Sequence, residues 1–329
     1  MEDVTVSGSA ATHGGGVYAE GCDLSLQGAT LTDNTAELGG GLYILGGDVV
    51  SLADVVVQGN TASGEDTAQG GGAWIREVTL LDVRDSLFLS NRVVFDSDGT
   101  DGGSSGGLRL SQVEDGLLDR VRIDGNVVEA LASEVGASSY GGGAEIIYST
   151  VRIRSAHIES NRLGQGSSTW PQGGGLFVYI SDVVIEDSSL VSNDAANGWG
   201  GGLSSVASTL SMDGVRFEAN EAMLHGAAFR IDQQSVAVTS STFIGNIGLN
   251  GTDSSCTVHL EDCTDCRLED VTLEDADTHY GIELERGEGI TLDGVDVVGG
   301  EVGVYLEYID SAAISDLSVS ESRDHALRL

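Results

Sequence analysis

Three aspartates with metal-binding spacing stand in the segment DSDGTD, namely Asp96, Asp98 and Asp101. A tight turn at Gly99 would direct their carboxylates toward one cation, and calcium prefers sites made of oxygen ligands alone. The bidentate Glu of an EF-hand is absent at the usual distance, and a solvated Asp-Gly loop is the alternative in a chain with 52 acidic residues. The sequence therefore indicates no required cofactor and one candidate calcium site.

Three of the four cysteines lie close together and near His259: Cys256, Cys263 and Cys266. A disulfide within this group would fit an oxidising compartment. The CxxC motif with a nearby His could instead hold zinc, and buried free thiols are the third alternative. All three interpretations stay open at the level of the sequence.

Aromatic residues occur at two kinds of position that suit ligand binding. The first kind recurs at one outward place in the repeat described below, where stacked rings would form a ladder: Tyr18, Tyr43 and Trp74. The second kind lies in, or at the end of, long connecting loops: Tyr140, Trp170 and Trp199. Rings beside carboxylates suit carbohydrate, so we expect these six residues to contact a glycan or a protein; rings that only cover a sheet face are the alternative.

An internal repeat sets the elements that position these residues. Eight times an opening glycine is followed by an apolar alternation and, 20 or 21 residues later, by Asn. The opening glycines are Gly14, Gly39, Gly70, Gly106, Gly141, Gly173, Gly200 and Gly226, and the asparagines are Asn34, Asn60, Asn91, Asn126, Asn161, Asn193, Asn220 and Asn246. Because this spacing hardly changes, each unit is one structural repeat.

Each unit alternates apolar and polar residues with a period of two, which is the pattern of β-strands. The apolar pairs fall in three groups per unit, such as Leu42 with Ile44, Val151 with Ile153, and Val215 with Phe217. Three short strands per coil, stacked about 4.8 Å apart, predict a right-handed parallel β-helix with a narrow apolar core. We expect Gly and Asn at opposite corners, with Asn in the left-handed region and its amides in a ladder along the axis.

The repeat extends beyond the marked units. Val4 and Val6 fit the last strand of a preceding coil with Ser9 in the place of Asn, and after Asn246 the coil length survives without the glycine mark. We expect one β-helix domain over residues 1–329 with about 11 or 12 coils, marked over 14–246 and unmarked over 247–329. Both ends stop within the pattern, which indicates a segment of a longer chain or a unit that associates end to end.

Two motifs of the repeat resemble those of the chlamydial polymorphic outer-membrane proteins. These are openings such as GGGVY, GGGLY and GGGLF, and the segments Phe88 to Asn91, Phe217 to Asn220 and Phe243 to Asn246. The resemblance covers about residues 14–246. It implies a β-helix in a secreted or surface-exposed region that binds or adheres.

The formal charge of −37 and the absence of Lys limit the partners of this chain. Such a charge would repel nucleic acid and anionic membranes. No apolar run approaches the roughly 18 residues that span a membrane, so direct membrane insertion is not expected. We expect an extracellular or cell-surface location.

Polysaccharide cleavage is one alternative function, because many parallel β-helices are lyases or hydrolases. Hydrolysis needs two carboxylates about 5 to 9.5 Å apart, for which Glu159 and Glu218 are outward candidates. Arg122, His157 and Arg216 share one outward position and form the best basic cluster. Since 52 acids bring some pair together by chance, the sequence leaves an enzyme open but favours binding.

All variation in length falls between each Asn and the next opening glycine, where the loops contain 4, 9, 14, 14, 11, 6 and 5 residues. Loops gathered on one face are where repeat proteins usually bind partners. The sequence therefore predicts a surface module that binds or adheres to a glycan or a surface protein through its mid-stack loops. A solenoid that stacks into filaments or spacers is the remaining alternative.

Overall fold

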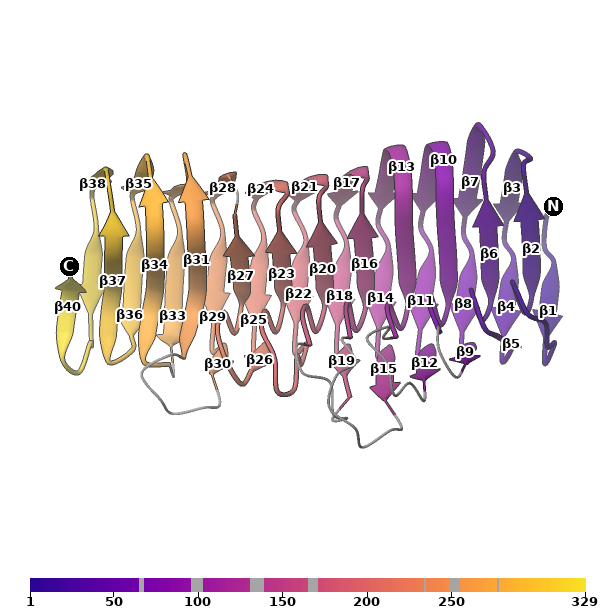
Figure 1. Ribbon diagram of the computed structural model, residues 1–329, viewed down its shortest axis with the longest axis horizontal. Helices are drawn as coiled ribbons and strands as arrows, with labels where there is room; N and C mark the ends of the chain where they lie inside the picture. The colour runs from indigo at the N-terminus through magenta and orange to yellow at the C-terminus, as the bar shows by residue number, and fades with distance from the viewer. Residues whose placement is uncertain are drawn as a thin grey trace.

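The computed structural model describes residues 1–64, 68–95, 103–130, 139–164, 171–233, 235–248, 255–276 and 278–329. In this part of the chain every regular element is a β-strand, and the paired strands run parallel. Successive turns of the chain stack along one axis, with the first coil at one end and the last at the other (Figure 1). The chain is the predicted right-handed parallel β-helix. No described residue lies in a helix long and apolar enough to cross a membrane.

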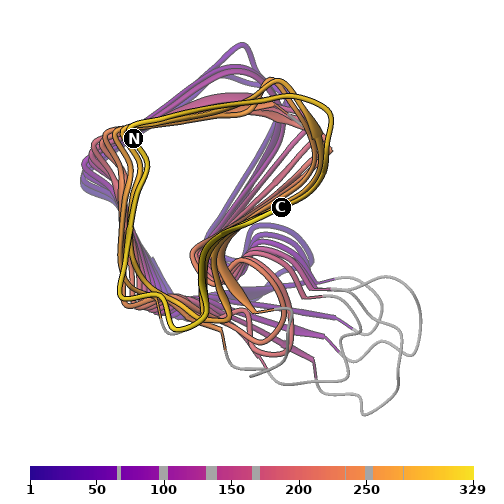
Figure 2. The same ribbon diagram turned by 90° about the vertical axis from the view of Figure 1, so that its left-hand side faces the viewer.

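Three long sheets form the sides of the stack, and Figure 2 shows them end-on around one interior. The first sheet contains β2 (Val17–Glu20), β6 (Leu42–Leu45), β10 (Ala73–Arg84), β13 (Leu108–Asp119), β16 (Ala144–Ile147), β20 (Leu176–Tyr179), β23 (Leu203–Val206), β27 (Phe229–Asp232), β31 (Cys256–Thr264), β34 (Tyr280–Glu288), β37 (Val302–Ile309) and β40 (His325–Arg328). The second contains the far halves of β10 and β13 with β3 (Leu24–Gln27), β7 (Val49–Ala53), β17 (Thr150–Arg154), β21 (Asp182–Glu186), β24 (Thr209–Asp213), β28 (Ser235–Thr239), β32 (Arg267–Glu269), β35 (Ile290–Asp293) and β38 (Ala312–Ser315). Because β10 and β13 run through the corner between these sheets, the two are continuous there.

The third sheet has twelve strands among the described residues, which confirms the expected number of coils. They are β1 (Thr5–Ser7), β4 (Thr30–Thr32), β8 (Val56–Gln58), β11 (Leu87–Leu89), β14 (Arg122–Asp124), β18 (His157–Glu159), β22 (Ser189–Val191), β25 (Arg216–Glu218), β29 (Thr242–Ile244), β33 (Thr272–Ala276), β36 (Asp296–Gly299) and β39 (Ser318–Ser320). A shorter layer lies outside the three-sided stack. It consists of β5 (Thr35–Ala36), β9 (Thr61–Gly64), β12 (Arg92–Phe95), β15 (Val127–Ala130) and β19 (Arg162–Leu163), followed by the pair β26 (Glu221–Ala222) and β30 (Ile247–Gly248).

Two apolar cores hold these layers. The main core fills the interior with inward side chains from all three sheets, including Leu42, Phe88 and Phe217, which are fully buried. Such side chains each contribute roughly 1.5–3 kcal/mol by leaving water. A second, smaller core lies under the outer layer and includes Val93 and Phe95. The loops thus start from a packed base rather than from a bare corner.

The eight asparagines form the predicted amide ladder. From Asn34 to Asn220, each Nδ2 donates to the Oδ1 of the Asn in the next coil at 2.9–3.0 Å, as Asn60 does to Asn91. Each Nδ2 also donates to a backbone carbonyl of the preceding coil, such as that of Leu31 for Asn60. Ser9 stands at the start of the ladder, as expected, and its N–H donates to Asn34. These buried amides are therefore fully hydrogen-bonded, as buried polar groups must be.

The expected left-handed conformation lies at the residue before each Asn, not at the Asn. Asp33, Ser90 and Ala219 have φ values of 54°, 51° and 51°, whereas none of the eight asparagines has a positive φ. The Asn side chain points inward to its neighbours along the axis, so the preceding residue makes the turn. The prediction for the backbone of Asn was wrong, although its structural role was right.

Gly and Asn meet at the same corner of the coil, and the prediction of opposite corners was wrong. In the run Gly39–Gly40–Gly41 the first residue has a φ of 63°, which favours glycine. A Cβ on Gly40 would lie 2.6 Å from the carbonyl oxygen of Thr61 in the outer layer, and one on Gly41 would lie 2.9 Å from the amide of Asn60. The glycine run therefore makes room for both the outer layer and the ladder.

One coil carries its mark a residue earlier than predicted. Leu108 pairs with Ala73, which stands three residues after Gly70, so the place of the opening glycine belongs to Ser105 and not to Gly106. Ser105 has a φ of 60° and is fully buried. A serine can therefore adopt the conformation that the other marked coils give to glycine.

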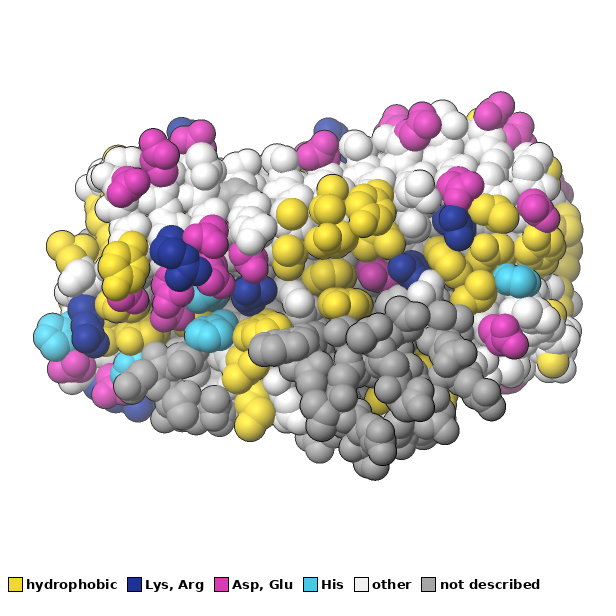
Figure 3. Space-filling model, viewed as in Figure 1, with side chains coloured by type: hydrophobic (Ala, Val, Ile, Leu, Met, Phe, Trp, Pro, Cys, Tyr) yellow, Lys and Arg dark blue, Asp and Glu magenta, His cyan; other side chains and the backbone are white. Residues whose placement is uncertain are grey.

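Charged and apolar side chains are unevenly spread over the face drawn in Figure 3. Acidic side chains gather toward the two ends and along the upper rim, and an apolar patch occupies the middle coils. Tyr148 and Ile180 are exposed large hydrophobic side chains of the middle coils.

Candidate metal centre

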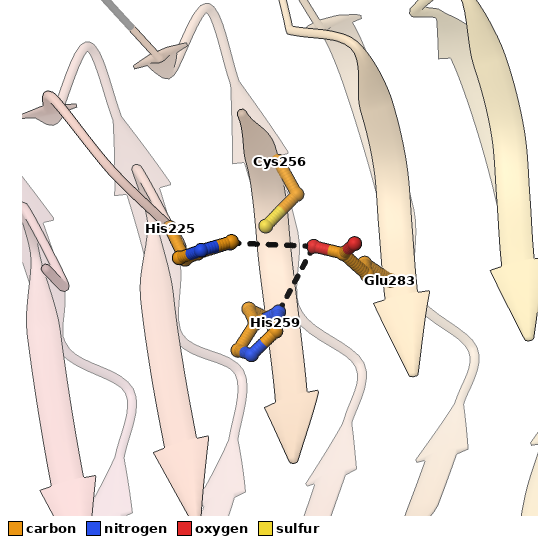
Figure 4. Close-up of side chains that lie close together, drawn as sticks. All are labelled: His225, Cys256, His259 and Glu283. Atoms are coloured by element: carbon orange, nitrogen blue, oxygen red, sulfur yellow. Dashed lines mark hydrogen bonds and ion pairs between the residues drawn. The ribbon is translucent and has the colours of Figure 1, made fainter. Parts of the chain in front are cut away.

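Four side chains with metal-binding atoms converge where the outer layer ends (Figure 4). His225 lies between β26 and β27, Cys256 and His259 lie in β31, and Glu283 lies in β34. Their ligand-type atoms all lie within 4.8 Å of one another. We call these four residues the metal centre.

The register of the first sheet brings these residues together. His259 pairs directly with Glu283 on the neighbouring strand, so their side chains leave the same side of the sheet. Phe229 pairs with both Leu203 and Val258, so Cys256 stands in the place of Ala227 in the preceding coil and of glycine in the marked coils before it. The side chain of Cys256 therefore occupies the corner that is filled by the outer layer elsewhere.

The metal centre is compact and largely shielded from solvent. Nδ1 of His259 lies 3.0 Å from Oε2 of Glu283, and Nδ1 of His225 lies 3.5 Å from the same oxygen. The side chains of His259 and Glu283 are 2% and 4% exposed, whereas that of His225 is 28% exposed. Cys256 is fully buried, and its Sγ accepts a hydrogen bond from the N–H of Gly226 at 3.3 Å. An ion would therefore reach the centre past His225.

Opposite charges lie together in this cluster. Burial alone would lower the pKa of His225, but hydrogen bonds to Cys256 and Glu283 outweigh it and raise that pKa to about 9. The same balance raises the pKa of His259 well above its usual range. Burial opposes ionisation of Glu283, yet hydrogen bonds from the two imidazoles hold its pKa at about 2. A cation that binds here takes the place of the protons on the imidazoles.

Glu261 orients His259 from outside the metal centre. Its Oε2 lies 3.6 Å from Nε2 of His259, on the side of the ring away from Glu283. The hydrogen bond with His259 is the main cause that lowers the pKa of Glu261 to about 2, and Arg230 and Arg286 also donate to this carboxylate. A carboxylate behind a His ligand fixes the ring and its tautomer in many metal sites.

The donor set fits a soft or borderline transition metal. One thiol, two imidazoles and one carboxylate suit zinc or copper, whereas calcium and magnesium prefer oxygen ligands alone. A tetrahedral ion with bonds of about 2.0–2.3 Å separates its ligands by roughly 3.3–3.8 Å. The distances from the two histidine Nδ1 atoms to Oε2 of Glu283, 3.0 and 3.5 Å, lie close to that range, and all ligand-type atoms of the four residues lie within 4.8 Å of one another. A small adjustment of the side chains would complete the coordination.

The cysteines divide between two roles that the sequence left open. Cys263 and Cys266 form a disulfide, which agrees with an oxidising compartment. The CxxC motif therefore does not hold zinc in this structure, whereas His259, which was considered with it, does join Cys256 in the metal centre. Cys22 is an exposed free thiol.

The predicted aromatic ladder is present but mostly covered. Tyr18 and Tyr43 stack with ring centroids 5.7 Å apart, and the edge of Trp74 meets Tyr43 at 5.2 Å. Tyr18 is 48% exposed, but Tyr43 and Trp74 are buried. The ring of His13 lies against Tyr43, so residues next to the opening glycines cover this stripe. A ligand-binding role for the ladder stays a prediction.

The loop residues have mixed outcomes. Tyr140 is half-buried and stacks on Phe177. Trp199 is also half-buried, and the guanidinium carbon of Arg230 lies 5.1 Å from the centroid of its ring. Trp170 and the candidate calcium ligands Asp96, Asp98 and Asp101 lie outside the described residues. Their proposed roles stay predictions.

The basic cluster considered for catalysis lies on the open face of the third sheet. Arg122 pairs in register with His157, as predicted, and Arg216 follows two coils later. Arg122 forms an ion pair with Asp124 at 2.7 Å, and Arg216 forms one with Glu218 at 2.6 Å. Their charges are thus balanced by neighbouring acids on a flat sheet.

The fold and the four converging ligands define a parallel β-helix with a buried set of transition-metal donors. A family model described as "Periplasmic copper-binding protein (NosD)" matches residues 185–329, which is less than half of the chain and includes the whole metal centre. No curated protein and no solved structure matches the chain. The match agrees with a β-helix and with a location in the cell envelope. It gives no support to the chlamydial proteins in particular.

Proposed function

We propose that this chain is a cell-envelope β-helix module that binds a copper ion at the metal centre. The convergence of four metal-ligand side chains from three successive coils carries the proposal. The match of the copper-binding family model to the segment that contains all four supports copper in particular. Cys256 supplies the soft sulfur ligand that copper favours, and His225, His259 and Glu283 would complete the set.

A direct titration of the full chain tests this proposal. Under anaerobic conditions, copper(I) competition with a chromophoric chelator should give one ion per chain. Substitution of a residue that only supports a metal ligand typically lowers the affinity roughly 10- to 100-fold. Cys256→Ser removes a ligand itself, so we expect a larger loss of copper affinity. Cys22→Ser is the matched control, because this thiol is exposed and distant in sequence from the centre, and should bind as the native chain does.

A parallel titration with zinc(II) separates the two metals that the donor set suits. Binding of zinc without copper would assign the metal centre to zinc and contradict the copper proposal. Binding of neither ion, or binding that is equal in the native chain and Cys256→Ser, would contradict a metal site altogether.

A second proposal is that the mid-stack loops bind a glycan or a surface protein. The small core that contains Val93, Phe95, Val128 and Leu163 supports it, because the loops of the middle coils rise from a packed and separately buried base. Replacing residues 131–138 by a short Gly-Ser link should abolish binding on glycan and cell-surface arrays while the melting temperature stays unchanged. Undiminished array binding by this variant would rule the loop out.

A further inference from the structure

A groove crosses the middle coils at the corner between the first and second sheets, away from the metal centre. It consists of two adjoining cavities of about 480 and 380 Å³ that share Tyr148. The first is lined by residues of four coils that include Ile180, Asp182 and Gln233, and the second by residues that include Tyr179. Each volume falls within the roughly 300–1,000 Å³ of small-molecule sites. We call the two together the middle groove.

The groove exists because the coils differ in how they turn this corner. On one side β10 and β13 continue through the corner as strands of 12 residues, and on the other β31 and β34 extend for nine. Between them β16, β20, β23 and β27 stop after four residues. The outline in Figure 1 dips accordingly between β13 and β31. The groove floor is thus flanked by two ridges of longer coils.

Aromatic rings run along the groove. Tyr140 stacks on Phe177 at 4.7 Å, Phe177 lies parallel to Tyr179 at 6.4 Å, and Tyr179 meets the edge of Tyr148 at 5.7 Å. Tyr148 is 52% exposed. These rings offer flat apolar surface to a ligand, and tyrosines add a hydroxyl at one edge.

A row of polar side chains borders the same groove. Asp182, Thr209 and Ser235 pair in register on adjacent coils of the second sheet. Over these three coils the row extends roughly 10 Å, from two spacings of about 4.8 Å. A ligand in the groove would therefore meet rings on one side and hydrogen-bonding groups on the other, over the length of a short oligomer.

The groove carries little charge for a protein with a net charge of −37. Among the residues that line its two cavities, Asp182 and Glu145 are the charged ones, and Glu145 is buried in an ion pair with Arg109 at 2.9 Å. A second copy of this chain would be repelled by the overall charge, and an anionic ligand likewise. The groove suits an uncharged ligand that presents both apolar faces and hydroxyl groups.

We propose that the middle groove binds a neutral oligosaccharide, with Tyr148 and Tyr179 as stacking surfaces. Sugar rings have the required combination of C–H faces and equatorial or axial hydroxyls, without charge. This site is distinct from the metal centre, which shares no residue with it and has ligands of a different kind.

Affinity electrophoresis of the full chain tests this proposal with defined probes: laminarin, mannan, dextran and xyloglucan as neutral polymers, and polygalacturonate and alginate as acidic ones. At least one neutral polymer should retard the native chain. Tyr148→Ala and Tyr179→Ala should each weaken that interaction about tenfold, as loss of one stacking ring implies. Far-ultraviolet circular dichroism checks that each variant keeps its β-structure.

Tyr308→Ala is the matched control. Tyr308 is 76% exposed, and its φ of 55° is close to the 52° of Tyr148, so both variants remove an exposed tyrosine from a left-handed corner. It lines neither cavity of the groove, and its variant should bind as the native chain does. Retardation by acidic polymers alone, by none of the polymers, or equally in all variants would overturn the proposal. So would a Tyr148→Ala variant that dissociates a native dimer in sedimentation, since a second copy would then occupy the groove.

Discussion

The coils that carry the Gly and Asn marks and the coils that lack them form the same β-helix with different residues at the corner. Over residues 14–246 each coil has an Asn in the ladder and an opening glycine, which Ser105 replaces in one coil, and an outer layer packs on the corner. After residue 250 the sequence contains no Asn, yet β31, β34 and β37 pair in the same register. The marks are therefore not needed for the β-helix. They are needed for the layer and the loops on top of it.

At the corner where the glycine run lies in the marked coils, the unmarked coils have no outer layer and carry larger side chains instead. Cys256, Tyr280 and Val302 occupy successive places that correspond to glycine in all marked coils except the last, which has Ala227, and they form a small buried cluster. Once a side chain fits there, a cysteine can lie beside His259 and Glu283. The metal centre thus lies at the boundary between the two regions, where the outer layer ends and side chains return.

The largest effect should come from placing a side chain under the outer layer. A Cβ on Gly142 would lie 2.3 Å from the carbonyl oxygen of Gly174 and 2.8 Å from the backbone of Arg162. We expect Gly142→Ala to cost about 3 kcal/mol or more, because backbone atoms on both sides must move. Val302→Ala, in the equivalent place of an unmarked coil, should cost about 1–2 kcal/mol through lost burial.

Hydrogen exchange with mass spectrometry measures both variants, since a stack of coils opens locally. The protected strands of the first sheet near each substitution report the local free energy of opening. Equal losses for Gly142→Ala and Val302→Ala would contradict the account of the corner given above.

The next largest effect concerns the ladder. Asn126→Ala removes the acceptor for both the backbone N–H and the Nδ2 of Asn91, and the donor to Asn161. We expect a loss of about 2–4 kcal/mol in local opening free energy, since each buried unsatisfied group costs about 1–3 kcal/mol. Asn246→Ala, at the last position of the ladder, should cost less because it has one Asn neighbour instead of two. Exchange at Asn91 and Asn220 compares the two, and a greater cost at the end would argue against a continuous ladder.

A smaller effect should sharpen the boundary at the metal centre. Glu261→Gln keeps the shape but removes the charge behind His259, and it should weaken copper binding about 10- to 100-fold without changing the number of ions bound. Glu269→Gln is the control, because this half-buried acid pairs with Arg267 elsewhere in the same coil, and it should leave the affinity unchanged. Unaltered affinity in Glu261→Gln would show that this carboxylate does not position the ligand.

The smallest effect is expected from the disulfide. The double variant with Cys263→Ser and Cys266→Ser should bind copper within about twofold of the native chain, because Cys256 and not the CxxC pair supplies the sulfur ligand. Loss of the cross-link over so short a loop should lower stability by about 2 kcal/mol or less. A large loss of copper affinity would return the CxxC motif to the role of ligand.

Periodicity was sufficient to predict the fold, because a constant distance from glycine to Asn leaves few arrangements other than stacked coils. It could not predict which side chains meet at a corner. The backbone turn falls one residue before Asn, and Gly40 faces Thr61 rather than an opposite corner, since both depend on the path of the outer layer. The strands of the outer layer are so short that the sequence shows only two or three alternating residues for each of them, which is too little to predict the layer.

The metal centre escaped prediction for a related reason. The CxxC motif and His259 drew attention because they are close in sequence, whereas His225 and Glu283 stand 34 residues before and 24 residues after His259. One signal was available, since 24 residues is the spacing of the unmarked coils and predicts that His259 and Glu283 lie side by side. The replacement of glycine by Cys256 becomes visible only when the register is known.

The asparagine ladder has a direction, and this has a consequence for how such a protein changes over time. Within the ladder each Asn from Asn34 to Asn220 donates to the carboxamide oxygen of the next coil, and each oxygen from Asn60 to Asn246 accepts from the preceding coil, so each internal coil presents the same two surfaces to its neighbours. Duplication or deletion of a whole coil therefore leaves every hydrogen bond with a partner of the right kind. The length of the molecule can evolve in increments of about 4.8 Å, independently of what its loops and its metal centre do.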